Sequence, residues 1–508
     1  MVDDEALDDE ALRSGGEVTM PDWVSWSAVA GALVVLAQLG VYVLAVGVIP
    51  GGRKPSTGMA WLILILAVPL LGILAFLFLG STHVERKRHR TQVAVNERIQ
   101  QRTAQVADLD ATNTPALGSV ATVAILNRRL GALPAVGGNT VELFSDYTES
   151  IAAMTAAVDE ASHFVHVEFY ITAWDEVTAP FFEALVRATE RGVPVRLLFD
   201  HLGSRGIPVY KDLLRKLDET KILWRPMMPI DLLHGKFRRP DLRNHRKILV
   251  VDGTCAFGGS QNMIEPSYDK PKNQQAGRAW VELTTRLEGP AVAEMNAVFL
   301  TDWYSETGEV LEETGRIDLS PATGGATIVQ VVPSGPGFAS ENNLRMFTTL
   351  IYSAQRRISL TSPYFVPDES LLYAVTTAAQ RGVEVELFVG EEGDQFMVHH
   401  AQRSYYHPLL SAGVRIYLYP APWVLHAKHF TIDDHVAVLG SSNMDLRSFA
   451  LNYEVSLMLI DPEVVKRMRT VEDTYRAASR ELTQQEWSER SKGSRYVDNV
   501  MRLTSALQ

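Results

Sequence analysis

Two copies of one residue pattern constrain this chain more than any other feature of its sequence. Each copy begins with His-x-Lys, runs through four more residues to Asp, and reaches a small-residue corner and Asn 17 residues after the histidine; the copies occupy residues 245–262 and 426–443. Two apolar runs separated by a turn lie inside each copy, which predicts a β-hairpin. On a strand, residues two apart point to the same face, so His and Lys project together. The duplication predicts two half-sites related by a pseudo-twofold axis and meeting at one phosphate.

The side chains that the two copies bring forward suit transfer of a phosphoryl group. One imidazole attacks phosphorus to form a covalent phosphohistidine, and the other protonates the leaving oxygen and then deprotonates the incoming nucleophile. Ammonium and amide groups neutralise charge on the non-bridging oxygens. The residues alone do not decide which histidine attacks. The candidate catalytic residues are His245, Lys247, Asp252, His426, Lys428 and Asp433.

Six further residues are expected to support this chemistry: Ser260, Asn262, Ser441, Asn443, Glu282 and Glu454. The serines and asparagines are candidates for holding the phosphate, and the glutamates for holding the second ring nitrogen of a histidine. The interval from Asn262 to Glu282 is 20 residues, against 11 in the second copy, so Glu282 is assigned on weaker spacing. Asp252 and Asp433 stand at odd offsets from the lysines, so we expect them to face away and brace the turns. The chain has no cysteine cluster and no HExxH, and we predict neither a metal nor a cofactor.

A third set of residues has the same spacing without the hairpin. His234, Lys236 and Asp241 enclose Phe-Arg-Arg-Pro rather than an apolar run, and Pro240 argues against a central strand. Position 251, where an asparagine would complete the pattern, is a valine. We interpret this segment as a basic loop beside the site.

The region around the two patterns also repeats. Each pattern is preceded by a strand, a helical stretch and an Arg-Gly-Val corner that opens another strand, at residues 191–193 and 381–383. Alternating strands and helices predict an α/β sandwich in each half, and Gly after a helix is a usual end signal. We expect the first half at 121–318, the second at 326–485, and a polar C-terminal tail at 486–508.

The N-terminal region predicts a membrane anchor. Residues 1–22 are acidic and predicted to be a disordered tail, and 23–80 contain two apolar stretches of about the length needed to span a bilayer, the second kinked at Pro69. The alternative is a buried helical hairpin of a soluble domain. Residues 81–120 form a basic and polar linker. The segments that flank the two spans on the side of the termini carry six Lys and Arg residues, and the short loop between the spans carries two. Positive charge stays on the cytoplasmic side, so we expect both termini and the body to be cytoplasmic. The basic run is either a topology signal or a contact for anionic lipid headgroups.

These motifs, together with stretches such as RNHRKILVVDG, TSPYFVPDESL and GSSNMDLRSFALNYE, resemble the phospholipase D superfamily, and within it the bacterial cardiolipin synthases. The resemblance covers the two-span N-terminus and nearly all of the remaining chain. It implies an α/β fold of two tandem phospholipase D-like sandwich halves with pseudo-twofold symmetry, preceded by a two-helix transmembrane hairpin. It also implies transfer of a phosphatidyl group between two phosphatidylglycerol molecules at the plasma membrane, giving cardiolipin and glycerol. By the same resemblance His245 is the nucleophile and His426 the acid/base.

Other readings of the same residues remain open. Water, serine or another lipid headgroup could replace phosphatidylglycerol as acceptor, so the alternatives are a phospholipase D-type hydrolase or another phosphatidyltransferase. A nuclease uses the same fold, but the formal net charge of −12 and the apolar spans argue against a nucleic-acid partner. A non-catalytic membrane adaptor is opposed by the intact His, Lys and Asn of both copies. The expected partners are phosphatidylglycerol, the bilayer and its anionic headgroups, and the sequence does not indicate an oligomeric state.

Overall fold

The structure is a computed structural model and describes residues 26–51, 55–80, 86–109, 118–131, 133–230, 239–311, 324–338 and 341–505. Several expectations lie outside these ranges, namely the acidic tail 1–22, the loop residues Arg53 and Lys54, and most of the boundary between the halves. His234 and Lys236 of the third spacing match are also outside the described residues. The chain divides into two units, Met1–Thr82 and His83–Gln508.

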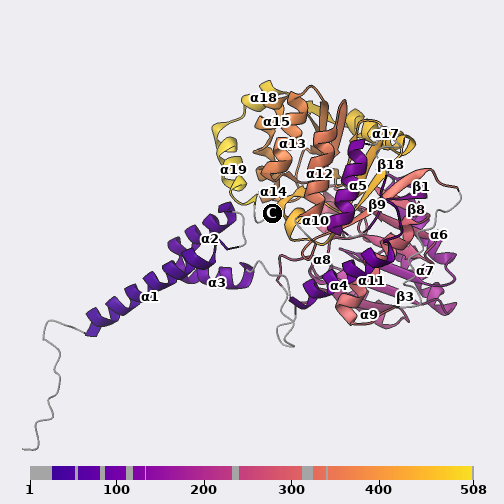
Figure 1. Cartoon of the computed structure of the whole chain (residues 1–508), viewed down its shortest axis with the longest axis horizontal. Coiled ribbons are helices and arrows are strands. Elements are labelled where there is room, and N and C mark those ends of the chain that lie inside the picture. Colours follow the sequence, from indigo (N-terminus) through magenta and orange to yellow (C-terminus); the bar gives the residue numbers. More distant parts are fainter. Residues whose placement is uncertain are drawn as a thin grey trace, which may run out of the picture. The chain divides into compact units, whose positions relative to one another are not determined.

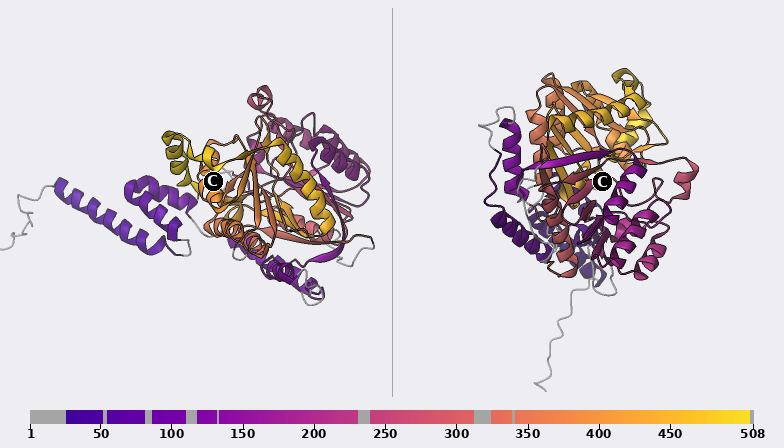
Figure 2. Two further views of the ribbon diagram at one scale, coloured as in Figure 1. Left: turned by 90° about the horizontal axis from the view of Figure 1, so that it is seen from above. Right: turned by 90° about the vertical axis from the view of Figure 1, so that its right-hand side faces the viewer.

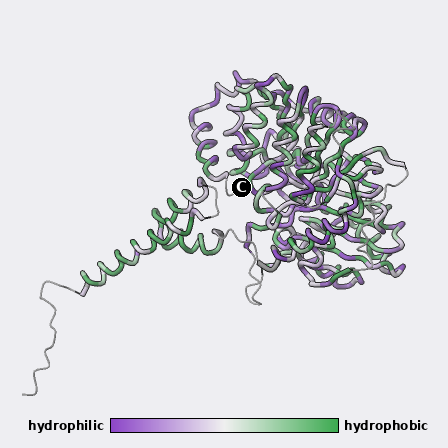
Figure 3. Tube along the Cα trace, viewed as in Figure 1, coloured by the Kyte–Doolittle hydropathy of each residue, from purple (hydrophilic) through white to green (hydrophobic). Residues whose placement is uncertain are grey.

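The first unit contains three apolar helices, α1 (Trp26–Val48), α2 (Pro55–Ala67) and α3 (Pro69–Leu79). Hydrophobic colouring covers nearly the whole of them (Figure 3). Within the described residues, one helix is long and apolar enough to cross a membrane by itself, over Ala28–Val48. The second expected span is divided at Val68, because Pro69 restricts the backbone before it and starts a new helix. The kink at Pro69 is therefore a break, and the two-helix transmembrane hairpin remains a prediction.

The second unit is an α/β body (Figure 1). Its helices are α4 (Arg86–Arg102), α5 (Gly118–Gly131), α6 (Tyr147–Asp159), α7 (Ala179–Glu190), α8 (His201–Arg205), α9 (Tyr210–Asp218), α10 (Pro271–Gln275), α11 (Ala291–Thr307), α12 (Asn342–Ser353), α13 (Glu369–Gln380), α14 (Phe396–Arg403), α15 (Tyr406–Ala412), α16 (Leu446–Ala450), α17 (Pro462–Ala478), α18 (Gln484–Ser488) and α19 (Lys492–Arg502).

The strands of the first half are β1 (Val136–Phe144), β2 (Val165–Phe169), β3 (Val195–Asp200), β4 (Leu223–Met227), β5 (Ile248–Val251), β6 (Cys255–Gly259), β7 (Trp280–Val281) and β8 (Thr284–Glu288). Those of the second half are β9 (Thr327–Ser334), β10 (Arg357–Thr361), β11 (Phe365–Val366), β12 (Glu384–Gly390), β13 (Arg415–Tyr419), β14 (Val424–Leu425), β15 (His429–Ile432), β16 (Val436–Gly440), β17 (Met444–Asp445), β18 (Glu454–Ile460) and β19 (Arg480–Leu482).

One long sheet carries both halves. Its order is β19-β13-β12-β10-β15-β16-β18-β9-β1-β8-β6-β5-β2-β3-β4, so the same series of strands runs outward in each direction from the antiparallel β9–β1 pair. In the first half the series is β1-β8-β6-β5-β2-β3-β4, and in the second it is β9-β18-β16-β15-β10-β12-β13. The internal duplication read from the sequence is therefore a pseudo-twofold axis at the centre of the sheet, and each histidine hairpin occupies the equivalent place in its half.

Helices cover the two faces of this sheet (Figure 2). One face is packed by α6, α7 and α9 in the first half and by α12, α13 and α15 in the second, each around its own apolar core. Residues of α11 and α17, the helices that follow β8 and β18, share a third core near the centre with strands of both halves. The sheet strands are buried on both faces, which explains why they read as continuous apolar runs rather than as alternating ones.

Two segments near the ends of the body, α5 and the C-terminal residues with α18 and α19, pack differently from what the sequence suggested. Helix α5 was expected with the first half, yet its Asn127 Nδ2 donates to Gln330 Oε1 of β9 at 2.9 Å and its apolar face joins the core of the second half. The polar C-terminal segment forms α18 and α19, and α19 is fixed to α14 by a 2.7 Å contact between His400 Nδ1 and Asp498 Oδ1.

Candidate active site

The two hairpins present their histidines and lysines from matching positions. In each, His and Lys lie just before the first strand, β5 or β15, and all four side chains are buried. Each lysine folds back over its own motif. Lys247 Nζ donates to His245 O at 2.5 Å, and Lys428 Nζ donates to His426 O at 2.7 Å while lying 3.0 Å from His426 Nε2. The lysines therefore occupy the place where a phosphate beside the imidazoles would need positive charge.

Main-chain contacts join each histidine segment to the opposite half. The backbone N–H of His245 donates to Tyr453 O at 2.9 Å, and that of His426 donates to Val281 O at 2.8 Å. The short strand β7 of the first half pairs in parallel with β14 of the second, directly before His426. Two motifs that are about 180 residues apart in the sequence thus meet at a single site between the halves.

The carboxylates that orient the histidines are exchanged between the halves. His245 Nδ1 lies 3.1 Å from Glu454 Oε2 and 3.0 Å from Ser441 O, both of the second half. His426 Nδ1 lies 2.6 Å from Glu282 Oε1 of the first half. The sequence named both glutamates as candidate partners of the histidines and did not decide which histidine Glu282 holds; in the structure each glutamate holds the histidine of the other half. Glu282 comes just before β8, and Glu454 is the first residue of β18. These two strands lie on either side of the central pair β9 and β1, so each glutamate can reach the histidine of the other half.

The two serines act on these carboxylates. Ser260 Oγ donates to Glu282 Oε2, and Ser441 Oγ donates to Glu454 Oε2, both at 2.5 Å. Each hydroxyl also accepts the backbone N–H of the residue after the glutamate, at 3.0 Å. The expectation that these hydroxyls bind phosphate is therefore corrected: they fix the carboxylates that in turn fix the imidazoles. Such outer partners set ring orientation and basicity.

Burial and the two lysines shape the electrostatics of the histidines. Burial, opposed by Glu454 and reinforced by Lys247, lowers the pKa of His245 to about 4. Burial likewise lowers the pKa of His426, against the opposing effect of Glu282. Both rings are therefore neutral near pH 7 before an anion binds. A neutral imidazole whose Nδ1–H is held by a carboxylate presents Nε2 as a nucleophile or base.

Burial lowers the pKa of both lysines. Burial, and then the charge of Lys428, lower the pKa of Lys247 to about 7. Burial lowers the pKa of Lys428 to about 8 despite the attraction of Glu282 and Glu454. For the two glutamates, burial raises the pKa, but the facing histidine, lysine and serine outweigh it and hold both carboxyls below their usual range. Two cations forced together in a buried site form a receptor for an anion.

The two asparagines differ, so the site is not symmetric. Asn262 donates from Nδ2 to the Tyr268 hydroxyl at 2.8 Å and accepts the Ile171 backbone N–H at 3.2 Å. Asn443 is buried, and its Oδ1 has no hydrogen-bond partner among the residues that the structure describes. Tyr268 comes from the longer segment between Asn262 and Glu282. The insertion therefore supplies the partner of Asn262 Nδ2, and Ile171 that of its Oδ1.

The two aspartates of the motifs lie away from the imidazoles. Asp252 accepts the backbone N–H groups of Ser162, His163 and Phe164 at 2.7–2.8 Å. Asp433 accepts those of Gln355, Arg356 and Arg357, at 2.7 to 3.3 Å. Both have positive φ, 53° and 49°. Each ties the hairpin turn to the segment before the neighbouring strand, β2 or β10, which agrees with the bracing role expected from their odd offsets.

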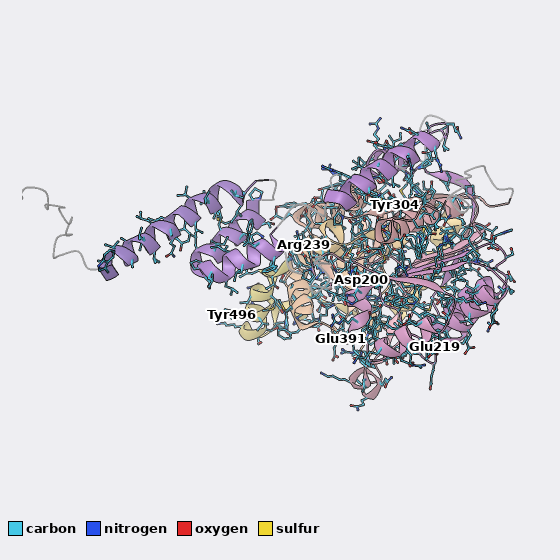
Figure 4. All side chains as sticks on the ribbon, turned by 90° about the horizontal axis from the view of Figure 1, so that it is seen from below. Asp200, Glu219, Arg239, Tyr304, Glu391 and Tyr496 are labelled. Atoms are coloured by element: carbon cyan, nitrogen blue, oxygen red, sulfur yellow. The ribbon has the colours of Figure 1, made fainter. Side chains whose placement is uncertain are left out.

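The sequence interpretation missed the residues that pack behind and beside the imidazoles. Arg246 is buried, pairs with Asp302, and donates from Nε to Glu454 O at 3.1 Å. Asp200, inside the body (Figure 4), pairs with Arg243 at 3.2 Å and accepts the Asn244 backbone N–H. The Tyr170 ring lies edge-on to His245, with centroids 4.7 Å apart. Arg246 stands between His245 and Lys247 in the sequence, and Arg243 precedes the motif, so the His-x-Lys spacing identifies neither arginine.

Among the residues that the structure describes, no three His, Cys, Asp or Glu side chains are grouped as ligands of a metal ion. The chemistry available to this arrangement comes from its side chains: two oriented imidazoles, two cations and an unpaired amide oxygen.

Comparisons with known proteins identify matching families and relatives. Residues 154–303 and 347–473 match the family model described as cardiolipin synthase, phospholipase D-like domain, and residues 40–81 match the model described as phospholipase D-nuclease N-terminal. Cardiolipin synthase A of Serratia proteamaculans and that of Yersinia pseudotuberculosis are each 32% identical over 492 residues, which is 95% of this chain and 98% of theirs.

A solved structure has the same fold. The phosphatidylserine synthase of Haemophilus influenzae superposes with a TM-score of 0.57 at 16% identity, covering 76% of this chain and 98% of that one. At that identity the likeness extends to the fold, namely the two tandem α/β halves.

Proposed function

The chain belongs to the cardiolipin synthase family of phospholipase D-like phosphatidyltransferases, and on this premise we propose that it transfers a phosphatidyl group from one phosphatidylglycerol molecule to a second, releasing glycerol. The observation that carries the proposal is the exchange of carboxylates between the halves. With Nδ1 of His245 held by Glu454 and Nδ1 of His426 held by Glu282, the Nε2 atoms are the ring nitrogens that would face a phosphate. Lys428 Nζ, 3.0 Å from His426 Nε2, would turn from that nitrogen to the phosphate oxygens.

In the first step His245 Nε2 attacks the phosphorus of the donor lipid. A P–N bond forms, the bond from phosphorus to the headgroup glycerol oxygen breaks, and His426 gives that oxygen a proton, so that glycerol leaves. In the second step neutral His426 takes the proton of a glycerol hydroxyl of the second lipid. That oxygen attacks phosphorus, the P–N bond breaks, and cardiolipin is formed. One phosphodiester replaces another, so no nucleotide is consumed.

The surrounding charges suit both steps. Lys247 and Lys428 would hold the non-bridging oxygens, and the anionic phosphodiester would raise the depressed pKa of each lysine and each histidine by adding a negative charge beside them. Protonated His426 is thereby favoured only when donor lipid is bound. The free Oδ1 of Asn443 is an acceptor for a hydroxyl of the lipid headgroup.

We further propose that the chain is anchored in the plasma membrane by two spans, Trp26–Val48 and the region of α2 and α3, with the body on the cytoplasmic side. The apolar helix α1 and the match of residues 40–81 support membrane attachment. The cytoplasmic side rests on the six-to-two distribution of basic residues around the spans.

Products formed from labelled lipid test the proposal. The full-length chain would be purified and given phosphatidylglycerol labelled in its headgroup glycerol. Equal amounts of free labelled glycerol and labelled cardiolipin are expected. Phosphatidic acid as the partner of the released glycerol would instead identify a hydrolase, and no release of glycerol would reject both activities.

The matched variants are His245→Ala, His426→Ala and His163→Ala. The first two are expected to abolish product, whereas His163, an exposed histidine before β2, serves as the control. Full turnover by either of the first two variants would contradict the two-histidine mechanism.

A further inference from the structure

Three large apolar side chains are exposed close to one another on the second half. Phe396 and Met397 begin α14, with exposed fractions of 66% and 43%, and Trp423 lies in the loop before β14, 48% exposed. We call these three residues the docking rim. Aromatic and thioether groups of this size are usually buried, so their exposure together needs a cause.

The docking rim stands beside the approach to the second-half histidine. A small pocket is lined by Gln395 and Val424, the chain neighbours of two rim residues, and by Tyr364. The centroid of the Tyr364 ring is 6.4 Å from that of His426. The pocket therefore lies beside the segments that carry the rim, and its Tyr364 is also the neighbour of His426.

The segments that carry the rim are tied down. Val424 N donates to Ala279 O at 2.9 Å, and β14 pairs with β7, so the loop with Trp423 is held by the first half. Helix α14 is fixed to α19 through His400 and Asp498. Because the rim is presented on ordered segments, its exposed apolar surface is a lasting feature of this face.

Lysines lie in solvent near the rim, and two nearby glutamates are in ion pairs. Helix α10 lies in the segment between Asn262 and Glu282, and Arg278 of the same segment pairs with Glu392 at 3.4 Å. Lys270, just before α10, and Lys272, in its first turn, are exposed. Glu391, the second carboxylate of this loop, is paired with Arg480 at 2.7 Å (Glu391 is labelled in Figure 4). Both glutamates thus pair with arginines, although Arg480 also pairs with Glu486, and Asp394 of the same loop accepts the Tyr364 hydroxyl at 2.9 Å. The two lysines remain in solvent.

Helix α19, which packs along α14, adds to this charge. Lys492 and Arg495 are exposed on it, as is the aromatic ring of Tyr496, at the edge of the body in Figure 4. The acidic residue of this helix, Asp498, is buried and paired with His400. Apolar and aromatic side chains flanked by lysine and arginine suit the boundary between acyl chains and anionic headgroups.

We propose that the docking rim inserts into the interfacial layer of an anionic phospholipid bilayer and so brings lipid headgroups to the pocket beside Tyr364. The inference rests on the proposed function, because a phosphatidyltransferase must take both substrates from a bilayer while its histidines are buried in the body. The same chain carries α1, a helix able to span that bilayer. The docking rim and α1 therefore both suit contact with a bilayer.

Depth measurements with a nitroxide label test the docking itself. Cys255 is the single cysteine and is buried, so Phe396→Cys and Trp423→Cys can be labelled selectively in the full-length chain. The matched control is Leu223→Cys on β4, the last strand at the opposite end of the sheet, with an exposed fraction of 49%. In vesicles of equal parts phosphatidylglycerol and phosphatidylcholine, labels at 396 and 423 should be relaxed more by oxygen than by a water-soluble nickel complex, and the label at 223 the reverse.

Kinetics separate docking from chemistry. With lipid in the same vesicles, Phe396→Ala combined with Trp423→Ala should lose about tenfold or more in kcat/KM beyond any loss measured with a short-chain monomeric phosphatidylglycerol, since two partly buried aromatic groups are removed from the interface. Leu223→Ala should lose equally little with both substrates.

The possible results distinguish the two proposals. Labels at 396 and 423 that are exposed to water in vesicles, or equal losses on vesicle and monomeric lipid, would overturn the docking proposal whatever the activity. Strong spin–spin broadening between labels on two copies would overturn it in favour of a self-association surface. Lipid-exposed labels in a chain that turns over neither lipid would leave the docking established and refute the enzymatic function.

Discussion

Replacing Glu454 by glutamine tests the exchange of carboxylates between the halves. Glu454 is fully buried, lies 3.1 Å from His245 Nδ1, and receives the Ser441 hydroxyl at 2.5 Å. Glutamine has the same shape, and its amide group takes the place of Oε2, the one oxygen that contacts both His245 Nδ1 and Ser441 Oγ. It removes the negative charge and lets an amide N–H face the imidazole, which favours the tautomer with the proton on Nε2.

The expected loss follows from these two changes. A carboxylate-to-amide change behind a catalytic histidine costs about 10⁴-fold where the tautomer is inverted, and loss of an outer partner costs about 10- to 100-fold where it is not. We therefore expect a fall in kcat of about 10²- to 10⁴-fold, or about 3 to 5 kcal/mol of barrier. Because Glu454 raises the pKa of His245, removing its charge should lower that pKa further below about 4.

The assay is single-turnover release of glycerol from phosphatidylglycerol, joined to a titration of the ring carbons of labelled histidine by NMR. Glu288→Gln, at the exposed end of β8, is the matched control and should leave both unchanged. The reasoning would be refuted if Glu454→Gln kept at least a third of the wild-type rate. A shift confined to the titration of His426 would refute it equally, since it would place this carboxylate with the histidine of its own half.

The remaining predictions concern the lysines, the turn aspartates and the small-residue corners. Because Lys247 and Lys428 must carry charge and have pKa values of about 7 and about 8, kcat/KM should fall as the pH rises through 7 to 8, which a pH–rate profile measures. Asp433→Ala strands the three backbone N–H groups that this carboxylate receives, so the free energy of unfolding should fall by about 2 to 4 kcal/mol in denaturant titrations. Gly440→Ala places a Cβ against the backbone of β18, which should cost about 1 to 3 kcal/mol and shift Glu454, lowering the activity of the folded protein.

Neighbouring positions supply the controls for these variants. Asp434 is exposed beside Asp433 and pairs with Arg356 alone, so Asp434→Ala should change the free energy of unfolding by less than about 0.5 kcal/mol. A Cβ at Gly206 would meet nothing within 4 Å, so Gly206→Ala should be tolerated. Equal effects at the paired positions would contradict the assigned roles of Asp433 and Gly440. A flat pH profile from 6 to 9 would contradict the role of the lysines.

The duplicated pattern was enough to predict the two halves, their hairpins and the faces that carry His245 and His426. It succeeded because alternation along a strand and the apolar runs on both sides of a turn are local properties. Asp252 and Asp433 face away as their odd offset from the lysine predicted, so their place among the candidate catalytic residues is corrected: both carboxylates accept backbone N–H groups of the segments that lead into β2 and β10. The strand order follows the same repeat on both sides of β1 and β9.

What the sequence did not predict depends on contacts between distant segments. The exchange of Glu282 and Glu454 arises because the halves meet through β1 and β9, and spacing along the chain carries no information about which strand lies across an interface. The sequence suggested that the serines bind phosphate because they follow the hairpins, but their hydroxyls donate to the carboxylates of Glu282 and Glu454. The break at Val68 depends on Pro69, a local signal that was read as a kink.

The most direct test of the central claim is to trap the covalent intermediate. The full-length chain would be mixed briefly with phosphatidylglycerol labelled at phosphorus, quenched in alkali, which preserves phosphohistidine, and digested for mapping by mass spectrometry. The account predicts the label on His245. In His426→Ala, which lacks the base of the second step, the level of label should rise when the donor lipid carries a leaving group that needs no proton. Label on His426 in the wild-type chain, or none on either histidine during active turnover, would contradict it.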